Sequence, residues 1–117
     1  MLMGATVKSR TPLTRCHKRY IVKGSVAFQG PGGESRGALL NVGQGGILAR
    51  TNATHEEGAT LTLHFHVAGY PETFATRGQV VGTKGTLLAI KFLAEPEGIT
   101  FLLDWLDLQH YTWSGVA

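Results

Sequence analysis

Arginine and lysine side chains gather near the start of the chain. Arg15 and Arg19 lie four positions apart, and no acidic residue precedes Glu34. A guanidinium carries a planar fork of donors, which can bind a phosphate, contact the acceptor edge of guanine or stack on a base. This basic segment is therefore suited to an anionic ligand or surface. Its cationic residues are Lys8, Arg10, Arg15, Lys18, Arg19 and Lys23.

A second cluster of informative residues is Asn41-Val42-Gly43-Gln44-Gly45-Gly46. The Asn41 side chain offers one acceptor and one donor group. Glycines permit positive φ and let a ligand come close to the backbone. The same residues also suit a tight turn or a β-bulge, in which asparagine bonds its own backbone, so both interpretations stay open.

Short strands must position these two clusters. A chain of 117 residues has the size of one domain, and its 16 glycines indicate many tight turns. The clearest alternation is in residues 60–67, where apolar side chains alternate with Thr60, Thr62, His64 and His66. We predict antiparallel strands that close into a barrel, at residues 20–29, 35–42, 47–51, 60–67, 73–81 and 86–93, with a hairpin turn at 30–33.

The apolar period becomes helical after Pro96. The positions with this spacing are Ile99, Leu102, Leu103 and Leu106. Three more apolar residues, Phe101, Trp105 and Leu108, make the apolar surface wider than one stripe. Such a helix needs contacts on more than one side, either from the barrel and the tail residues Tyr111 and Trp113 or from a second copy in a homodimer.

The two clusters, in this order on this strand pattern, resemble the PilZ domain family. The family motifs read R-x-x-x-R and [D/N]-x-S-x-x-G, and the resemblance covers roughly residues 15–108. It implies an all-β fold, a six-stranded antiparallel β-barrel with a C-terminal α-helix. We divide the chain into a flexible basic arm at 1–19, the barrel with its helix at 20–110, and a tail at 111–117.

The resemblance also implies a ligand, cyclic di-GMP, held on the outside of the barrel. Arg15 and Arg19 are then the principal ligand-holding pair, Asn41 hydrogen-bonds a guanine, and Gly46 matches the family glycine. Gly43 stands where the family usually has serine. A lost hydroxyl removes about 0.5 to 3 kcal/mol, depending on the charge of its partner, and binding weakens by about ten- to a hundredfold at the upper end. Arg10 and Lys18 can add electrostatic attraction.

The resulting functional hypothesis is a cyclic di-GMP receptor that signals to an effector protein. The ligand bridges the arm to the 41–46 turn, and the ordered arm presents a new surface. A first alternative is a degenerate PilZ domain that lacks the ligand and acts as a protein-interaction adaptor. A second is an OB-like barrel that binds single-stranded nucleic acid.

Other functions find less support in the sequence. The net charge of +3 is too mild to indicate nucleic acid, and the single Cys16 excludes an intrachain disulfide. His64 and His66 lack a third ligand for a metal, and no nucleophile, base and acid form a catalytic set. With no long apolar run, we expect a cytoplasmic protein with no enzymatic activity, cofactor, metal or membrane partner.

Overall fold

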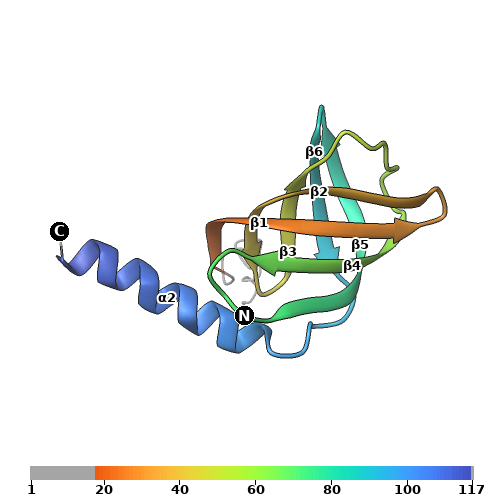
Figure 1. Ribbon diagram of the computed structural model, residues 1–117. Helices are drawn as coiled ribbons and strands as arrows, with labels where there is room; N and C mark the ends of the chain where they lie inside the picture. The colour runs from red at the N-terminus through yellow and green to blue at the C-terminus, as the bar shows by residue number, and fades with distance from the viewer. Residues whose placement is uncertain (1–17, 117) are drawn as a thin grey trace, which may run out of the picture.

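The chain folds into a closed barrel of six antiparallel strands followed by a helix (Figure 1). This computed structural model describes residues 18–116 and, within them, the side chains of residues 18–109. Around the barrel the strands follow the order β1-β2-β3-β6-β5-β4. Their bounds are β1 Arg19–Gly30, β2 Gly33–Gly43, β3 Gly46–Arg50, β4 Thr60–Val67, β5 Thr73–Lys84 and β6 Leu87–Phe92, and the helix is α2 Ile99–Val116. The predicted six-stranded all-β barrel with a C-terminal helix is confirmed.

The observed strand limits differ from the prediction by a residue or two at several ends, and most at the two described next. Arg19 already belongs to β1, where it pairs with Gly43, although the sequence assigned it to the loop. Strand β5 continues to Lys84, because a bulge at Val81 maintains its pairing with β6. The turn that follows therefore centres on Gly85, whose φ of 61° favours glycine.

Alternating side chains from all six strands fill the barrel. Phe65 lies at the centre of an aromatic stack, with ring centroids 5.3 Å from Phe74 and 5.9 Å from Phe92. Burial of one such side chain contributes roughly 1.5 to 3 kcal/mol. On β1 the side chains of Val26 and Phe28 are buried, while His64 on β4 points to solvent.

Helix α2 covers one end of the barrel and then extends away from it (Figure 1). Its buried residues Ile99, Leu102 and Leu106 join the barrel core, as their spacing predicted. Trp105 packs on Tyr70, with ring centroids 5.2 Å apart, so part of the wide apolar surface contacts the barrel. The helix runs to Val116, so residues 111–116, assigned to the tail from the sequence, continue it.

Two apolar side chains of α2 remain at the surface. Phe101 is 71% exposed and Leu108 is 60% exposed. The side chains of Tyr111 and Trp113 lie outside the described residues. The homodimer expected through this helix stays a prediction.

In the described part of the chain, no helix is long and apolar enough to cross a membrane. Residues 18–109 also hold no group of three or more His, Cys, Asp or Glu side chains that could bind a metal ion.

Candidate functional site

The barrel brings the described parts of the two sequence motifs together. Arg19 begins β1 and pairs with Gly43 at the end of β2, while Ile21 pairs with Asn41. The Arg19 guanidinium donates a hydrogen bond from Nη1 to the amide oxygen Oδ1 of Asn41, at 3.2 Å. Antiparallel pairing thus places the last arginine of R-x-x-x-R beside the asparagine of the second motif.

Gly43 is buried beneath the chain segment that enters β1. A Cβ atom built at Gly43 would lie 2.7 Å from the carbonyl oxygen of Lys18 and 3.3 Å from Cγ of Arg19. The first distance is shorter than normal contact, so any side chain here must displace the backbone of Lys18. The absence of a side chain lets the start of β1 lie directly against the motif.

Gly46 serves strand packing. It lies in β3, and a Cβ atom there would meet the backbone oxygen of Ile90 on β6. The sequence suggested that Gly43, Gly45 and Gly46 could adopt positive φ, and that expectation is wrong. The described glycines with positive φ are Gly33, Gly58, Gly69, Gly85 and Gly98. Gly43 and Gly46 instead have no room for a side chain, because the backbone of Lys18 or of Ile90 lies against them; the predicted approach of a ligand stays a prediction.

A surface groove of about 460 Å³ runs beside this motif. Arg19 lies at one side and the β6 residues at the other, with small residues between them. Its lining consists of Arg19, Gly43, Gly45, Val81, Ala89, Ile90, Lys91 and Phe92. The backbone N–H of Phe92 donates to the carbonyl oxygen of Gly45 at 2.8 Å, which fixes the motif turn on β6.

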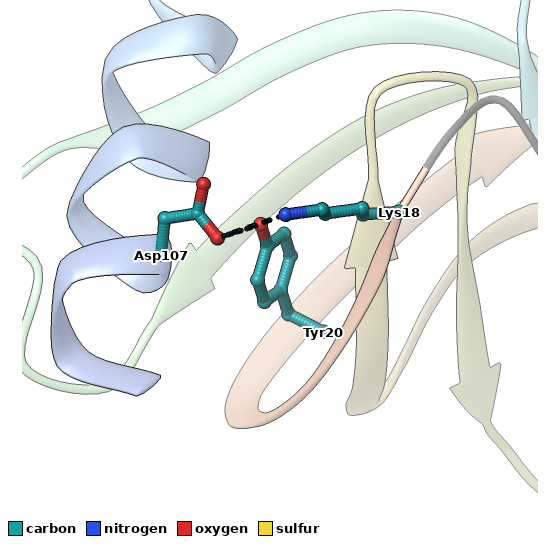
Figure 2. Close-up of polar contacts among 3 residues, drawn as sticks. All are labelled: Lys18, Tyr20 and Asp107. Carbon is teal, nitrogen blue, oxygen red and sulfur yellow. Dashed lines mark hydrogen bonds and ion pairs between the residues drawn. The ribbon is translucent and has the colours of Figure 1, made fainter. Parts of the chain in front are cut away.

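On the other side of the same entry segment, two side chains reach helix α2. Figure 2 shows Lys18 and Tyr20 converging on Asp107. The Tyr20 hydroxyl donates to Oδ1 of Asp107 at 2.6 Å, and Nζ of Lys18 lies 3.5 Å from the same oxygen. Lys18, expected to attract a ligand, is thus engaged with a carboxylate.

The ionisation of Tyr20 reflects this contact. Burial, followed by the hydrogen bond from its hydroxyl to Asp107 and the charges of Asp107 and Asp104, raises the pKa of Tyr20 to about 12. The phenol therefore stays protonated and remains a donor. No sequence pattern indicates this pair, because residues 20 and 107 belong to different elements that only the folded chain brings together.

Several predicted residues lie outside the described part of the chain. They are Arg10, Arg15 and Cys16. The structure therefore describes only those predicted site residues that belong to the barrel, which are Arg19, Asn41, Gly43 and Gly46.

The protein is thus a small β-barrel domain with a surface groove whose lining includes the cationic residues Arg19 and Lys91. The family model for the PilZ domain matches residues 13–104, and the chain belongs to this family. PilZ domains are binding and adaptor domains of cyclic di-GMP signalling. The six strands also distinguish the barrel from the five-stranded OB-fold of the nucleic-acid alternative.

The structure is similar to that of the Bacillus subtilis inhibitor of motility, MotI/DgrA, with a TM-score of 0.68. Sequence identity is 17%, and the match covers 82% of this chain and 51% of MotI/DgrA. At this identity the similarity shows a shared fold. The chain spans about half the length of that protein. A search of curated proteins found no match.

Proposed function

We propose that this PilZ domain binds cyclic di-GMP in the groove beside Arg19 and passes the signal to an effector protein. The observation that carries the proposal is the hydrogen bond between Arg19 and Asn41, which lie 22 positions apart in the sequence. The guanidinium lines the groove and the Asn41 amide lies beside it, and both groups can hydrogen-bond a guanine edge.

The partner of Arg19 leaves its charge available. Asn41 is neutral, so the guanidinium keeps its positive charge and its remaining donors for a phosphate or a guanine edge. Cyclic di-GMP offers both kinds of acceptor. In the proposed complex the dinucleotide lies between the barrel and residues 10–19, and Arg15 supplies the second guanidinium.

In this proposal, ligand binding reaches the effector protein through a change at helix α2. Lys18 and Tyr20 flank Arg19 in the sequence, and both contact Asp107 of α2. A ligand that changes the position of Arg19 therefore acts on the segment that holds the helix. Binding then fixes residues 10–19 against the barrel and alters the surface next to α2.

Titration calorimetry of the full chain with cyclic di-GMP tests the proposal. We expect saturable binding that is weakened in both Arg15→Ala and Arg19→Ala. The absence of heat at high micromolar ligand contradicts it, as does unchanged affinity in both variants.

A second candidate function is an adaptor that binds no cyclic di-GMP. Exposed apolar side chains favour it, since Ile21 is 92% exposed and Phe101 and Leu108 also face solvent. Gly43, in place of the family serine, favours it too. The same calorimetry discriminates the two functions, because the adaptor binds its protein partner without the nucleotide.

A further inference from the structure

Lys91 of β6 lines the same groove as Arg19 of β1. It is exposed on β6, next to the inward-facing Ile90, and so points outward. Its partner in β3 is Gly46, the last residue of the second motif. Gly46 has no side chain, and the backbone of Ile90 and Lys91 lies where its Cβ would be, so β3 and β6 pack closely beneath Lys91.

The groove is bounded by two cations from strands that are not neighbours. In the barrel order, β2 and β3 separate β1, which carries Arg19, from β6, which carries Lys91. The groove crosses this interval over Gly43 and Gly45. Positive charge on both sides favours a ligand with more than one anionic group.

The floor near Lys91 is apolar. Val81 is 52% exposed at the β5 bulge, and Ala89 lies beside it in the groove lining. Ligand sites typically combine such an apolar surface with a few placed polar groups. Here the apolar part can receive the flat face of a base, while the charges at the edges receive phosphates.

We infer that Lys91 is a second phosphate-binding residue of the groove, opposite Arg19, with Val81 and Ala89 as the apolar floor. The inference rests on the proposed function, since it assigns part of the same site. The two cations play different parts. Arginine presents a fork that can engage guanine or phosphate, whereas the lysine ammonium is a point charge suited to a single phosphate oxygen.

The test compares Lys91→Gln with Lys23→Gln in calorimetric titrations with cyclic di-GMP. Lys23 is an exposed lysine of β1 that does not line the groove, so its variant makes the same charge change elsewhere. We expect Lys91→Gln to bind about tenfold more weakly than wild type. Lys23→Gln should stay within about twofold of wild type, because its charge is solvated and screened. Lys91→Arg should retain most of the affinity, because it keeps the charge and a phosphate donor.

The outcomes separate this inference from the proposed function. If the wild type binds, Arg19→Ala binds weakly and Lys91→Gln equals Lys23→Gln, the role of Lys91 is refuted while the receptor function stands. If the wild type does not bind, the receptor function itself fails. Circular dichroism and thermal unfolding of each variant establish that the barrel remains folded in every comparison.

Discussion

The two ends of strand β1 carry hollows of similar size but opposite chemistry. The groove beside Arg19 has a volume of about 460 Å³, and a second hollow at the β1–β2 hairpin has about 510 Å³. Arg19 and Lys91 line the first, whereas Glu34 and Glu56 line the second. The two volumes are similar, so it is the sign of the lining charges that favours the Arg19 end for an anionic ligand.

The polar groups at the hairpin end serve local structure. Oγ of Ser35 lies 3.2 Å from Nε2 of His55, and the His55 ring lies 5.4 Å from the ring of Phe28. These contacts attach the segment after β3 to the hairpin. At the other end, the Arg19 guanidinium bonds a neutral amide and retains its charge. The hairpin contacts join parts of the chain, while the Arg19 contact leaves a positive charge on the groove.

Removal of Arg19 should produce the largest change in ligand affinity. Each hydrogen bond to a charged group contributes about 1.5 to 3 kcal/mol, so Arg19→Ala should weaken cyclic di-GMP binding by about a hundredfold in calorimetry. The control is Arg50→Ala, because Arg50 is an exposed arginine at the far end of β3. Equal affinity of the two variants contradicts the assignment of the ligand to the Arg19 end.

Two substitutions at Gly43 test how much the absence of the family serine's hydroxyl weakens ligand binding. Both Gly43→Ala and Gly43→Ser must displace the Lys18 carbonyl, so each should lower the free energy of unfolding by about 1 to 3 kcal/mol in denaturant titrations. Because the two variants differ only by a hydroxyl group, the difference in their affinity for cyclic di-GMP measures the contribution of that hydroxyl. We expect Gly43→Ser to bind cyclic di-GMP about tenfold more tightly than Gly43→Ala. Equal affinities mean that the hydroxyl makes no ligand contact at this position.

The sequence predicts the barrel and part of the site because both depend on local patterns. Alternation along β4 and the helical spacing after Pro96 fix element type, and the spacing of Arg19 and Asn41 matches a known pair of motifs. Close contacts between backbone segments cannot be predicted in this way, because the segments are far apart in the sequence. Gly43 meets Lys18, and Gly46 meets Ile90, only once the strands have paired. For the same reason, Lys91 and Asp107 could not be assigned from the sequence.

The link from Tyr20 to α2 should affect stability more than affinity. Tyr20→Phe removes one hydrogen bond and should lower the free energy of unfolding by about 1 kcal/mol near neutral pH. Because folding raises the pKa of Tyr20 from 10.0 to about 12, its contribution is complete below pH 10 and declines as pH rises toward 12. Denaturant titrations across this range should show a steeper decline for wild type than for Tyr20→Phe.

Asp107→Asn provides an independent check of the same contact. The variant removes the negative charge and leaves a neutral amide oxygen as the acceptor, so the pKa of Tyr20 should fall, while burial still holds it above its usual value. The phenolate absorbance, taken as the difference between each protein and its Tyr20→Phe counterpart, reports this pKa. An unchanged titration curve contradicts the Tyr20–Asp107 interaction.

Charge removal at the hairpin end should have the smallest effect. The double variant Glu34→Gln, Glu56→Gln leaves the Arg19 groove intact, so its affinity for cyclic di-GMP should stay within about twofold of wild type. A loss of tenfold or more in calorimetry contradicts the distinction between the two ends.

A nitrogen–proton correlation NMR titration of the full chain with cyclic di-GMP follows both ends of the barrel in one experiment and so locates the ligand. We expect large shifts of the backbone amides of Arg19, Asn41, Gly45 and Lys91, and small shifts at Glu34, Ser35 and His55. Shifts confined to the hairpin end, or none at saturating ligand, contradict this expectation.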